Sequence, residues 1–148
     1  LNPPSASELV TIIERTTATE TPSIRAVADG AELIAMNELV LGEPVPTHVV
    51  EYVARLIVAT HPNQSGSTPN IKQFVRYGAS PRGAQAIILG AKATALIEGR
   101  YNVSFEDVLS VMKPALRHRM LLNFDGMAEG VAVDTLIEEL ANSLPKNS

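Results

Sequence analysis

The sequence predicts an all-α fold, a bundle of about six helices. Apolar residues recur in six segments at the i, i+3, i+4, i+7 spacing of core-facing helices. No segment shows a convincing alternation of apolar and polar residues, which a half-buried strand would require. The connections between the six segments are short, as in helical bundles. With 148 residues the chain can bury one hydrophobic core, so we expect a single domain over residues 1–148.

The first two helices are expected in the opening third of the chain. The first begins at Ser5, because the run from Ser5 to Glu8 has the form of a capping box, and a threonine-rich stretch around Glu20 interrupts it. Its apolar residues are Leu9, Ile12 and Ile13. The second begins at Pro22, since proline suits a first helical position, and stops at Gly42. Its expected stripe is Ile24, Val27, Ala28, Ala31, Ile34 and Ala35.

A third helix and a loop follow. The helix is expected after Pro46 and ends at His61 and Pro62. Its core-facing residues are Val49, Val50, Val53, Leu56 and Ile57. Residues 61–70 combine two prolines, a glycine and several small polar residues, so we expect an exposed and mobile loop there.

Three more helices complete the expected bundle. The fourth runs from Pro81 to Glu98, with Gly99 as its stop. The fifth opens at Ser104 and is expected to kink at Pro114. The inward-facing residues are Ala84, Ile87, Ile88, Ala91 and Ala95 in the fourth helix, Phe105, Val108, Leu109, Met112, Ala115 and Leu116 in the fifth, and Val133, Leu136, Ile137, Leu140 and Leu144 in the last.

Composition excludes several kinds of site. The chain has no cysteine, which excludes disulfides, thiolate metal ligands and a cysteine nucleophile. His48, His61 and His118 share no close ligand spacing, so we expect no metal site. No apolar run is long enough to span a bilayer and no secretion leader opens the chain. We therefore expect a cytoplasmic protein with no membrane partner.

Charge is unevenly distributed along the chain, whose net charge is −4. Residues 70–119 carry eight cationic and three acidic side chains, whereas both flanking segments are acidic. Such a positive zone would suit an anion-facing surface, but a solvated helix face would show the same pattern. The basic cluster of Lys113, Arg117, His118 and Arg119 could contact nucleic acid, a neighbouring subunit or another domain. The acidic chain favours a protein contact and argues against nucleic acid.

The start of the fourth helix contains an electrostatic anomaly. Ser80 is a favourable N-cap, Pro81 suits the first helical position, and Gly78 allows a tight turn before them. Arg82 then places a cation in the first turn, at the positive end of the helix dipole, which costs some tenths of a kcal/mol. A residue that is locally unfavourable and brings no evident gain in stability often has a function.

An anion at this helix start would remove the conflict. The free N–H groups of the first turn and the Arg82 guanidinium would then face the same negative charge, for which phosphate is the natural guest. Each charge-assisted hydrogen bond to phosphate contributes roughly 1.5–3 kcal/mol, more than the dipole penalty. The alternative is a salt bridge from Arg82 to an acid on a neighbouring helix, since such pairs are common.

Four stretches of the chain resemble one known family. They are EPVPTHVVEYVARLIVATHP at residues 43–62, YGASPRGAQA at 77–86, GRYNVSFEDV at 99–108 and PALRHRMLLNF at 114–124. Together they closely resemble the C-terminal helical lid of MoxR-family AAA+ ATPases, and they keep its order. The opening helix looks like the one that follows the ATPase core of this family. The likeness covers nearly the whole chain, so it implies a helical bundle of the AAA+ lid type.

The resemblance also implies a role for the anomalous arginine. In the family, the arginine of GASPR resembles the sensor 2 residue of AAA+ proteins, which reaches from the lid toward the terminal phosphates of ATP. That role maps onto Arg82 as the catalytic and ATP-binding arginine. Gly78, Ala79, Ser80 and Pro81 would shape its approach, with Ser80 capping the helix. The arginine would sense the last phosphate and couple hydrolysis to lid rotation.

The resemblance implies an enzyme only for a larger parent protein. ATP and Mg²⁺ would act there, with Mg²⁺ held by the nucleotide-binding core. This chain has no G-x-x-x-x-G-K-[ST] phosphate loop and no apolar strand ending in Asp-Glu. We therefore expect no ATP hydrolysis by this chain alone.

The family likeness further implies several partners. They are the parent's own AAA+ core, neighbouring subunits of a ring, and a protein with a von Willebrand A-type domain. The implied role is a chaperone-like motor that remodels client proteins or assists their maturation and metal-cofactor loading. The alternative is a free-standing helical adaptor that binds a protein through the basic middle segment. It predicts that an internal acid pairs with Arg82.

Overall fold

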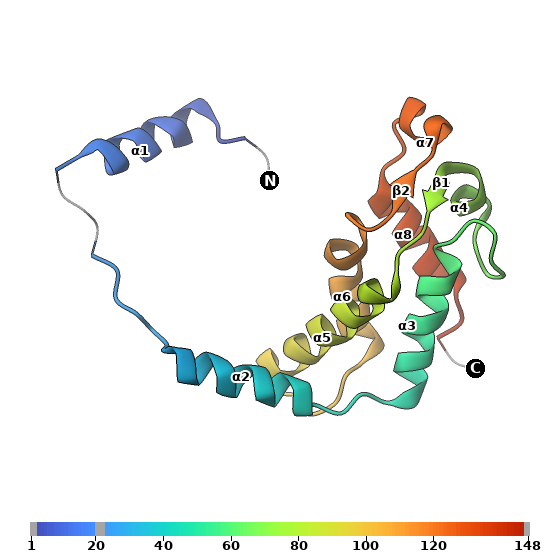
Figure 1. Ribbon diagram of the computed structural model, residues 1–148, viewed down its shortest axis with the longest axis horizontal. Helices are drawn as coiled ribbons and strands as arrows, with labels where there is room; N and C mark the ends of the chain where they lie inside the picture. Colours follow the sequence, from blue (N-terminus) through green and yellow to red (C-terminus); the bar gives the residue numbers. More distant parts are fainter. Residues whose placement is uncertain (1–2, 20–22, 147–148) are drawn as a thin grey trace. The chain divides into compact units, whose positions relative to one another are not determined.

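A computed structural model of the chain describes residues 3–19 and 23–146 (Figure 1). The chain divides into two compact units, residues 1–33 and 34–148, and each is described by itself. All buried hydrophobic residues of the described part lie in the second unit. None of the described residues 3–19 and 23–33 is buried, and the single lid domain expected over residues 1–148 stays a prediction.

The all-α class is confirmed, with eight helices in the described residues rather than six. The helices are α1 (Ala6–Thr17), α2 (Gly30–Gly42), α3 (Thr47–Ala59), α4 (Pro69–Phe74), α5 (Pro81–Ile97), α6 (Phe105–Leu116), α7 (Phe124–Ala128) and α8 (Val133–Ser143). Two short strands, β1 (Val75–Tyr77) and β2 (Leu121–Leu122), pair with each other. Sequence periodicity missed α4 and α7 because helices of five or six residues are too short to show it.

The expected start of the first helix is confirmed. Ser5 is the N-cap of α1, and its backbone N–H donates to Oε2 of Glu8 at 2.8 Å while the N–H of Glu8 donates back to Oγ of Ser5 at 3.4 Å. None of the residues of α1 is buried. Its apolar residues Leu9, Val10, Ile12 and Ile13 are each about half exposed.

The expected start of the second helix is wrong. The helix begins at Gly30, and Pro22 lies outside the described residues. The start is set by Asp29 and Glu32, whose side chains each accept a 2.8 Å hydrogen bond from the other's backbone N–H. Ile24 and Val27, expected on the apolar stripe, lie before the helix and are more than nine-tenths exposed. The stop at Gly42 is confirmed.

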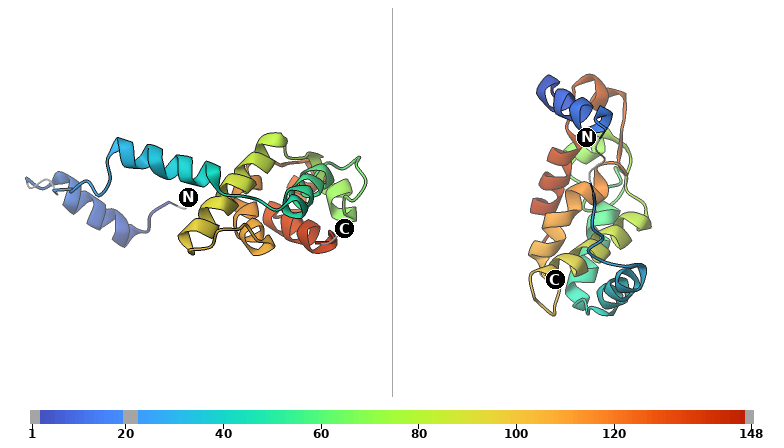
Figure 2. Two further views of the ribbon diagram at one scale, coloured as in Figure 1. Left: turned by 90° about the horizontal axis from the view of Figure 1, so that it is seen from below. Right: turned by 90° about the vertical axis from the view of Figure 1, so that its left-hand side faces the viewer.

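The core of residues 34–148 is built by the four long helices α3, α5, α6 and α8. Helix α5 packs against α3 and α6, and α8 packs against α6 and α3, as the views of Figure 2 also show. The expected inward residues of α5, α6 and α8 are all buried or partly buried against this core. None of the helices in the described ranges is long and apolar enough to cross a membrane.

One core residue of α3 was missed and another was wrongly included. Tyr52 is fully buried, and its hydroxyl donates to the carbonyl oxygen of Ala141 in α8 at 3.1 Å. Val50 is 45% exposed instead. The buried face follows positions 49, 52, 53, 56 and 57, which is the helical spacing, and position 50 lies one residue away from it.

The two-stranded sheet closes one end of this unit. The strands are antiparallel, with Val75 opposite Leu122 and Tyr77 opposite Leu121. Just before it, the expected exposed loop at residues 61–70 is only partly so. Ser67 and Thr68 are buried, and the Oγ1 atom of Thr68 accepts from the N–H of Ile71 as the N-cap of α4. Residues 63–66 are exposed, and their mobility stays a prediction.

Candidate functional site

The candidate site is the loop between β1 and helix α5, together with the first turn of that helix. Pro81 is the first residue of α5 and Ser80 occupies the N-cap position with extended backbone, as expected. The Ser80 side chain makes no capping hydrogen bond, however, so the expectation that it caps the helix is wrong. Its carbonyl oxygen accepts from the N–H of Gly83 at 2.8 Å. The first turn of α5 is thus left without a side-chain cap.

Arg82 is exposed in this first turn. In the described part of the chain, its guanidinium has no hydrogen-bond or ion-pair partner. No acid from a neighbouring helix satisfies it there, although the adaptor alternative requires one. The cation thus stands at the positive end of the helix dipole without compensation from any described residue.

Gly78 is needed for a different reason from the one expected. Its backbone does not have the positive φ that favours glycine, so a tight turn is not what requires it. A Cβ atom at position 78 would instead lie 2.6 Å from Oγ1 and 2.7 Å from the carbonyl carbon of Thr60. The loop therefore packs directly on the backbone at the end of α3, which only glycine permits.

Ala79 is held by its backbone. Its N–H donates to Oγ1 of Thr60 at 2.9 Å, and its carbonyl oxygen lies 3.1 Å from Nε2 of His61. Since a carbonyl oxygen only accepts, Nε2 of His61 carries the proton in this contact. The Thr60 hydroxyl donates its own hydrogen to the carbonyl of Ile57 at 2.6 Å, which leaves its oxygen free to accept. The backbone N–H and carbonyl of the buried Ala79 therefore both have a hydrogen-bond partner, Thr60 at the end of α3 and His61 in the turn after it.

The beginning of α5 also packs closely on its neighbours. A Cβ atom at Gly83 would lie 3.0 Å from Leu116 of α6 and 3.2 Å from Ile57 of α3. Beside this contact, an open hollow of about 330 Å³ is bordered by Ile57, His61, Ala79 and Pro81, among others. Arg82 is not among the residues that line it. The start of α5 is therefore held by close packing against both α3 and α6.

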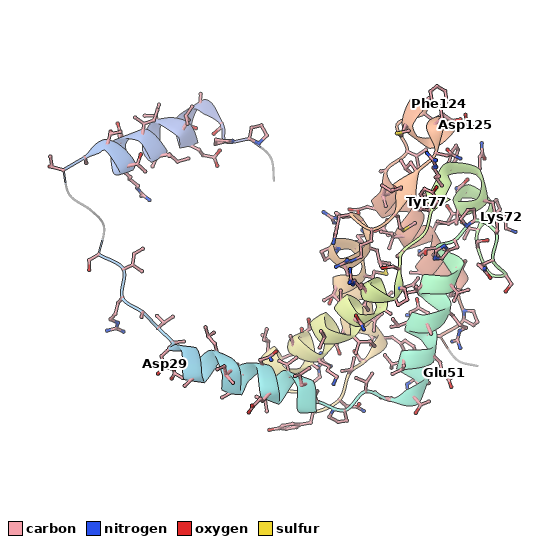
Figure 3. The ribbon with its side chains drawn as sticks, viewed as in Figure 1. Asp29, Glu51, Lys72, Tyr77, Phe124 and Asp125 are labelled. Atoms are coloured by element: carbon pink, nitrogen blue, oxygen red, sulfur yellow. The ribbon has the colours of Figure 1, made fainter. Side chains whose placement is uncertain are left out.

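Tyr77 precedes the loop and is 55% exposed. Figure 3 places it near the end of β1, toward the part of the molecule that carries Phe124 and Asp125. The guanidinium of Arg76 lies 5.1 Å from the centre of the Tyr77 ring, a cation–π contact. The cation next to the loop is therefore engaged, in contrast to Arg82.

Sequence reasoning missed the best-satisfied ion pair, which joins the end of α5 to the start of α6. The guanidinium of Arg100 donates to both carboxylate oxygens of Asp107, at 2.5 and 2.8 Å, and to Glu98 at 2.6 Å. The hydrogen bond from Arg100 lowers the pKa of Asp107 to about 2, helped by bonds from the N–H and hydroxyl of Ser104 and opposed by burial. The signal in the sequence that could have indicated it is the spacing of Ser104 and Asp107, three residues apart as in a capping box.

The basic cluster is largely engaged with its own fold. Lys113 forms an ion pair with Glu138, and Arg117 pairs with Asp134 at 2.9 Å, both across to α8. The Nε atom of Arg119, in the turn after α6, donates to the carbonyl of Ala115 at the end of that helix at 2.9 Å. The cluster therefore stabilises the packing of α6 on α8 more than it offers free charge. Among the described residues, no group of three acidic or histidine side chains could hold a metal ion.

Comparison with known proteins agrees with this fold. Residues 69–140, which include the loop and Arg82, match the family described as the AAA lid domain. The chain is similar to the chaperone MoxR1 of Mycobacterium tuberculosis, with 30% identity over 141 residues, 95% of this chain and 37% of that protein. It is similar to the protein MoxR of Paracoccus denitrificans, with 41% identity over 51 residues, 34% of this chain and 15% of that protein.

A solved structure shares the fold. A crystal structure of a protein from Cytophaga hutchinsonii matches with a TM-score of 0.83 and 21% identity, covering 98% of this chain and 44% of that one. The chain spans less than half the length of each of these relatives.

Proposed function

We propose that this chain, a MoxR-like AAA+ lid, supplies Arg82 as the sensor 2 arginine of a larger ATPase. The observation that carries the proposal is the unpaired guanidinium of Arg82 in the first turn of α5. A cation kept there without a partner in the described residues is unfavourable unless an anion binds, because it opposes the helix dipole. The proposed anion is the terminal phosphate of ATP.

The residues around Arg82 suit a phosphate. The Ser80 hydroxyl does not occupy the N–H groups of the first turn. Because Pro81 has no N–H and the N–H of Gly83 donates to the Ser80 carbonyl, the groups left to donate to a phosphate are the N–H and the guanidinium of Arg82. Pro81 fixes the first helical φ and removes one donor that would have no partner. Gly78 and Ala79 hold the loop against α3. When bound, ATP would supply the phosphoanhydride that is hydrolysed, and Mg²⁺ would be held by the parent's core.

The rest of the proposed function follows from the family. The parent would be an ATPase that works as a chaperone-like motor in a ring, in the cytoplasm, acting on client proteins in maturation or metal-cofactor loading. A protein with a von Willebrand A-type domain is a proposed partner. The similarity to a chaperone supports the general role, while the ring and the partner rest on family likeness alone. Since the chain has no phosphate loop, we expect it not to hydrolyse ATP alone.

The adaptor alternative is weaker. It requires an acid that pairs with Arg82, and the described residues provide none. In the basic middle segment through which the adaptor would bind its partner, Lys113 and Arg117 are already paired with α8.

The test is the substitution Arg82→Ala in the complete ATPase. Loss of one or two charge-assisted hydrogen bonds to phosphate should lower the ATPase rate roughly 10- to 100-fold. Lys72→Ala is the matched control, because it removes another exposed cation from the same cation-rich segment, on helix α4 (Figure 3). The control should retain the activity. Unchanged ATPase activity and nucleotide response in Arg82→Ala would exclude the sensor role.

A further inference from the structure

We propose that Thr60 and His61, at the end of α3, are positioning residues that hold Arg82 in the orientation its function needs. The proposal rests on the sensor role of Arg82. It adds that the end of α3 fixes the position of the backbone that carries this arginine. Neither residue touches the anion. They act through the backbone of Ala79, three residues before Arg82.

The link begins with two hydrogen bonds to one residue. Thr60 accepts from the N–H of Ala79 at 2.9 Å, and His61 donates to its carbonyl oxygen at 3.1 Å. Thr60 and Ala79 are both fully buried, so water does not compete for the first of these bonds. A buried N–H that lost its acceptor would carry the full desolvation penalty, which gives the contact a strong preference for one geometry.

Close packing reinforces the hydrogen bonds on either side. Gly78 lies so near the backbone of Thr60 that a Cβ atom there would meet three of its atoms within 2.7 Å. Beyond Ala79, Gly83 sits against Ile57 and Leu116. The segment that carries Arg82 is therefore bounded by two tight contacts with α3.

His61 is itself held by the turn after α3. Its N–H donates to the carbonyl of Val58 at 3.1 Å, and its carbonyl accepts from the N–H of Gln64 at 3.2 Å. The hydroxyl of Ser67 donates to the carbonyl of Gln64 at 2.7 Å, which closes the same turn. Hydrogen bonds within this turn thus hold His61 where its ring contacts the carbonyl of Ala79.

Arg82 depends on this arrangement more than an ordinary side chain would. No described residue holds its guanidinium, so only its backbone decides where it starts. Between Ala79 and Arg82 stand Ser80, in extended backbone, and Pro81, whose ring fixes φ. A displacement of the Ala79 backbone would therefore displace the backbone of Arg82 by a similar amount. Misplacement of a catalytic group by about 1 Å can cost on the order of 100-fold in rate.

The experiment compares Thr60→Val and Thr60→Ser in the complete ATPase, each with Arg82 present and with Arg82→Ala. Valine keeps the size of threonine and removes the acceptor for Ala79, while serine keeps it. We expect Thr60→Val to lower kcat/KM about tenfold, since a buried donor loses its partner. We expect Thr60→Ser to restore most of the activity. In the Arg82→Ala background, Thr60→Val should cause no further loss, because nothing is left to position.

His61 is tested in the same way. His61→Ala removes the donor to the Ala79 carbonyl, whereas His61→Gln supplies an amide N–H that reaches the same atom. We expect His61→Ala to lower kcat/KM several-fold and His61→Gln to retain more activity. Thr68→Val is the matched control, because Thr68 is also buried and also accepts from a backbone N–H, but at the start of α4. It should lower stability without lowering kcat/KM.

A second readout on the 148-residue chain follows the Ala79 amide by hydrogen exchange. Thr60→Val should raise its exchange rate by at least tenfold relative to amides of α8, because the hydrogen bond that protects it is gone. An equal loss of kcat/KM with and without Arg82 would overturn the positioning role and leave the sensor role standing. Faster exchange with unchanged kcat/KM would do the same. A silent Arg82→Ala would overturn both, since the arginine would then have no function to position.

Discussion

The carboxylate of Asp107, at the start of α6, receives two hydrogen bonds from the guanidinium of Arg100, at 2.5 and 2.8 Å, while the Asp107 side chain is almost fully buried. Arg100 follows Gly99, whose φ of +71° ends α5 in the left-handed region. The pair therefore connects the loop after α5 to the first turn of α6, the two helices that pack most extensively in the described residues. Among the ion pairs of the described residues, it is the one with a buried carboxylate.

Asp107→Asn should make stability less dependent on pH. The folded pKa of Asp107, about 2, lies below its ordinary value of 3.8, so the stability it contributes is present above pH 4 and is lost as pH falls toward 2. We expect the variant to be about 2 kcal/mol less stable at pH 7. The difference from the parent chain should shrink below pH 4.

Urea unfolding of the 148-residue chain at several pH values between 7 and 3 measures this. Glu98→Gln is the control, because Glu98 bonds the same arginine but is exposed, and its effect should stay below roughly 1 kcal/mol. A stability difference between Asp107→Asn and the parent chain that stays constant from pH 7 to pH 3 would contradict the assignment.

Arg82→Ala should barely change stability, unlike the loss of another arginine. Arg82 is exposed and unpaired within the described residues, and its charge opposes the helix dipole, so we expect a change within about 0.5 kcal/mol, in the stabilising direction. Arg100→Ala should instead clearly destabilise the fold, because it removes the cation that pairs with the buried Asp107 carboxylate. Thermal and urea unfolding of both variants compare them. A destabilisation of Arg82→Ala similar to that of Arg100→Ala would show that Arg82 has a structural partner.

Gly78→Ala should destabilise the fold by about 1–3 kcal/mol through overpacking. The added methyl would lie 2.6–2.7 Å from Thr60, two of whose contacted atoms are backbone and cannot move aside like a flexible side chain. Gly42→Ala is the control, since nothing lies within 4 Å of a Cβ atom there and its φ is negative. We expect the control to be neutral or slightly stabilising. Equal stability of the two variants, measured by urea unfolding, would contradict the close approach.

The start of the second helix shows a limit of sequence reasoning. Proline at position 22 and a later capping pair at Asp29 and Glu32 are both valid start signals, and local rules do not rank them. In the structure, the reciprocal hydrogen bonds of the capping pair decide, and Ile24 and Val27 stay outside the helix. Ile24 and Val27 have the spacing of a helical stripe, but neither side chain is buried.

The sequence by itself determined the all-α class, the inward faces of α5, α6 and α8, the capping box at Ser5, the opening of α6 at Ser104, and the start of α5 at Pro81. These features depend on hydrophobic periodicity and on hydrogen bonds between residues three or four apart, which a sequence displays directly. The placement of Arg82 in a first helical turn belongs with them. Its sensor role rests on family likeness and stays a proposal.

Only the tertiary structure decided which groups meet across long separations in the chain. The Tyr52 hydroxyl bonds to the carbonyl of Ala141 in α8, and Thr60 and His61 bond to the backbone of Ala79 from 19 and 18 residues away, respectively. None of these contacts has a periodic signature, because each depends on how two helices pack. Whether Arg82 meets an acid was open in the sequence for the same reason.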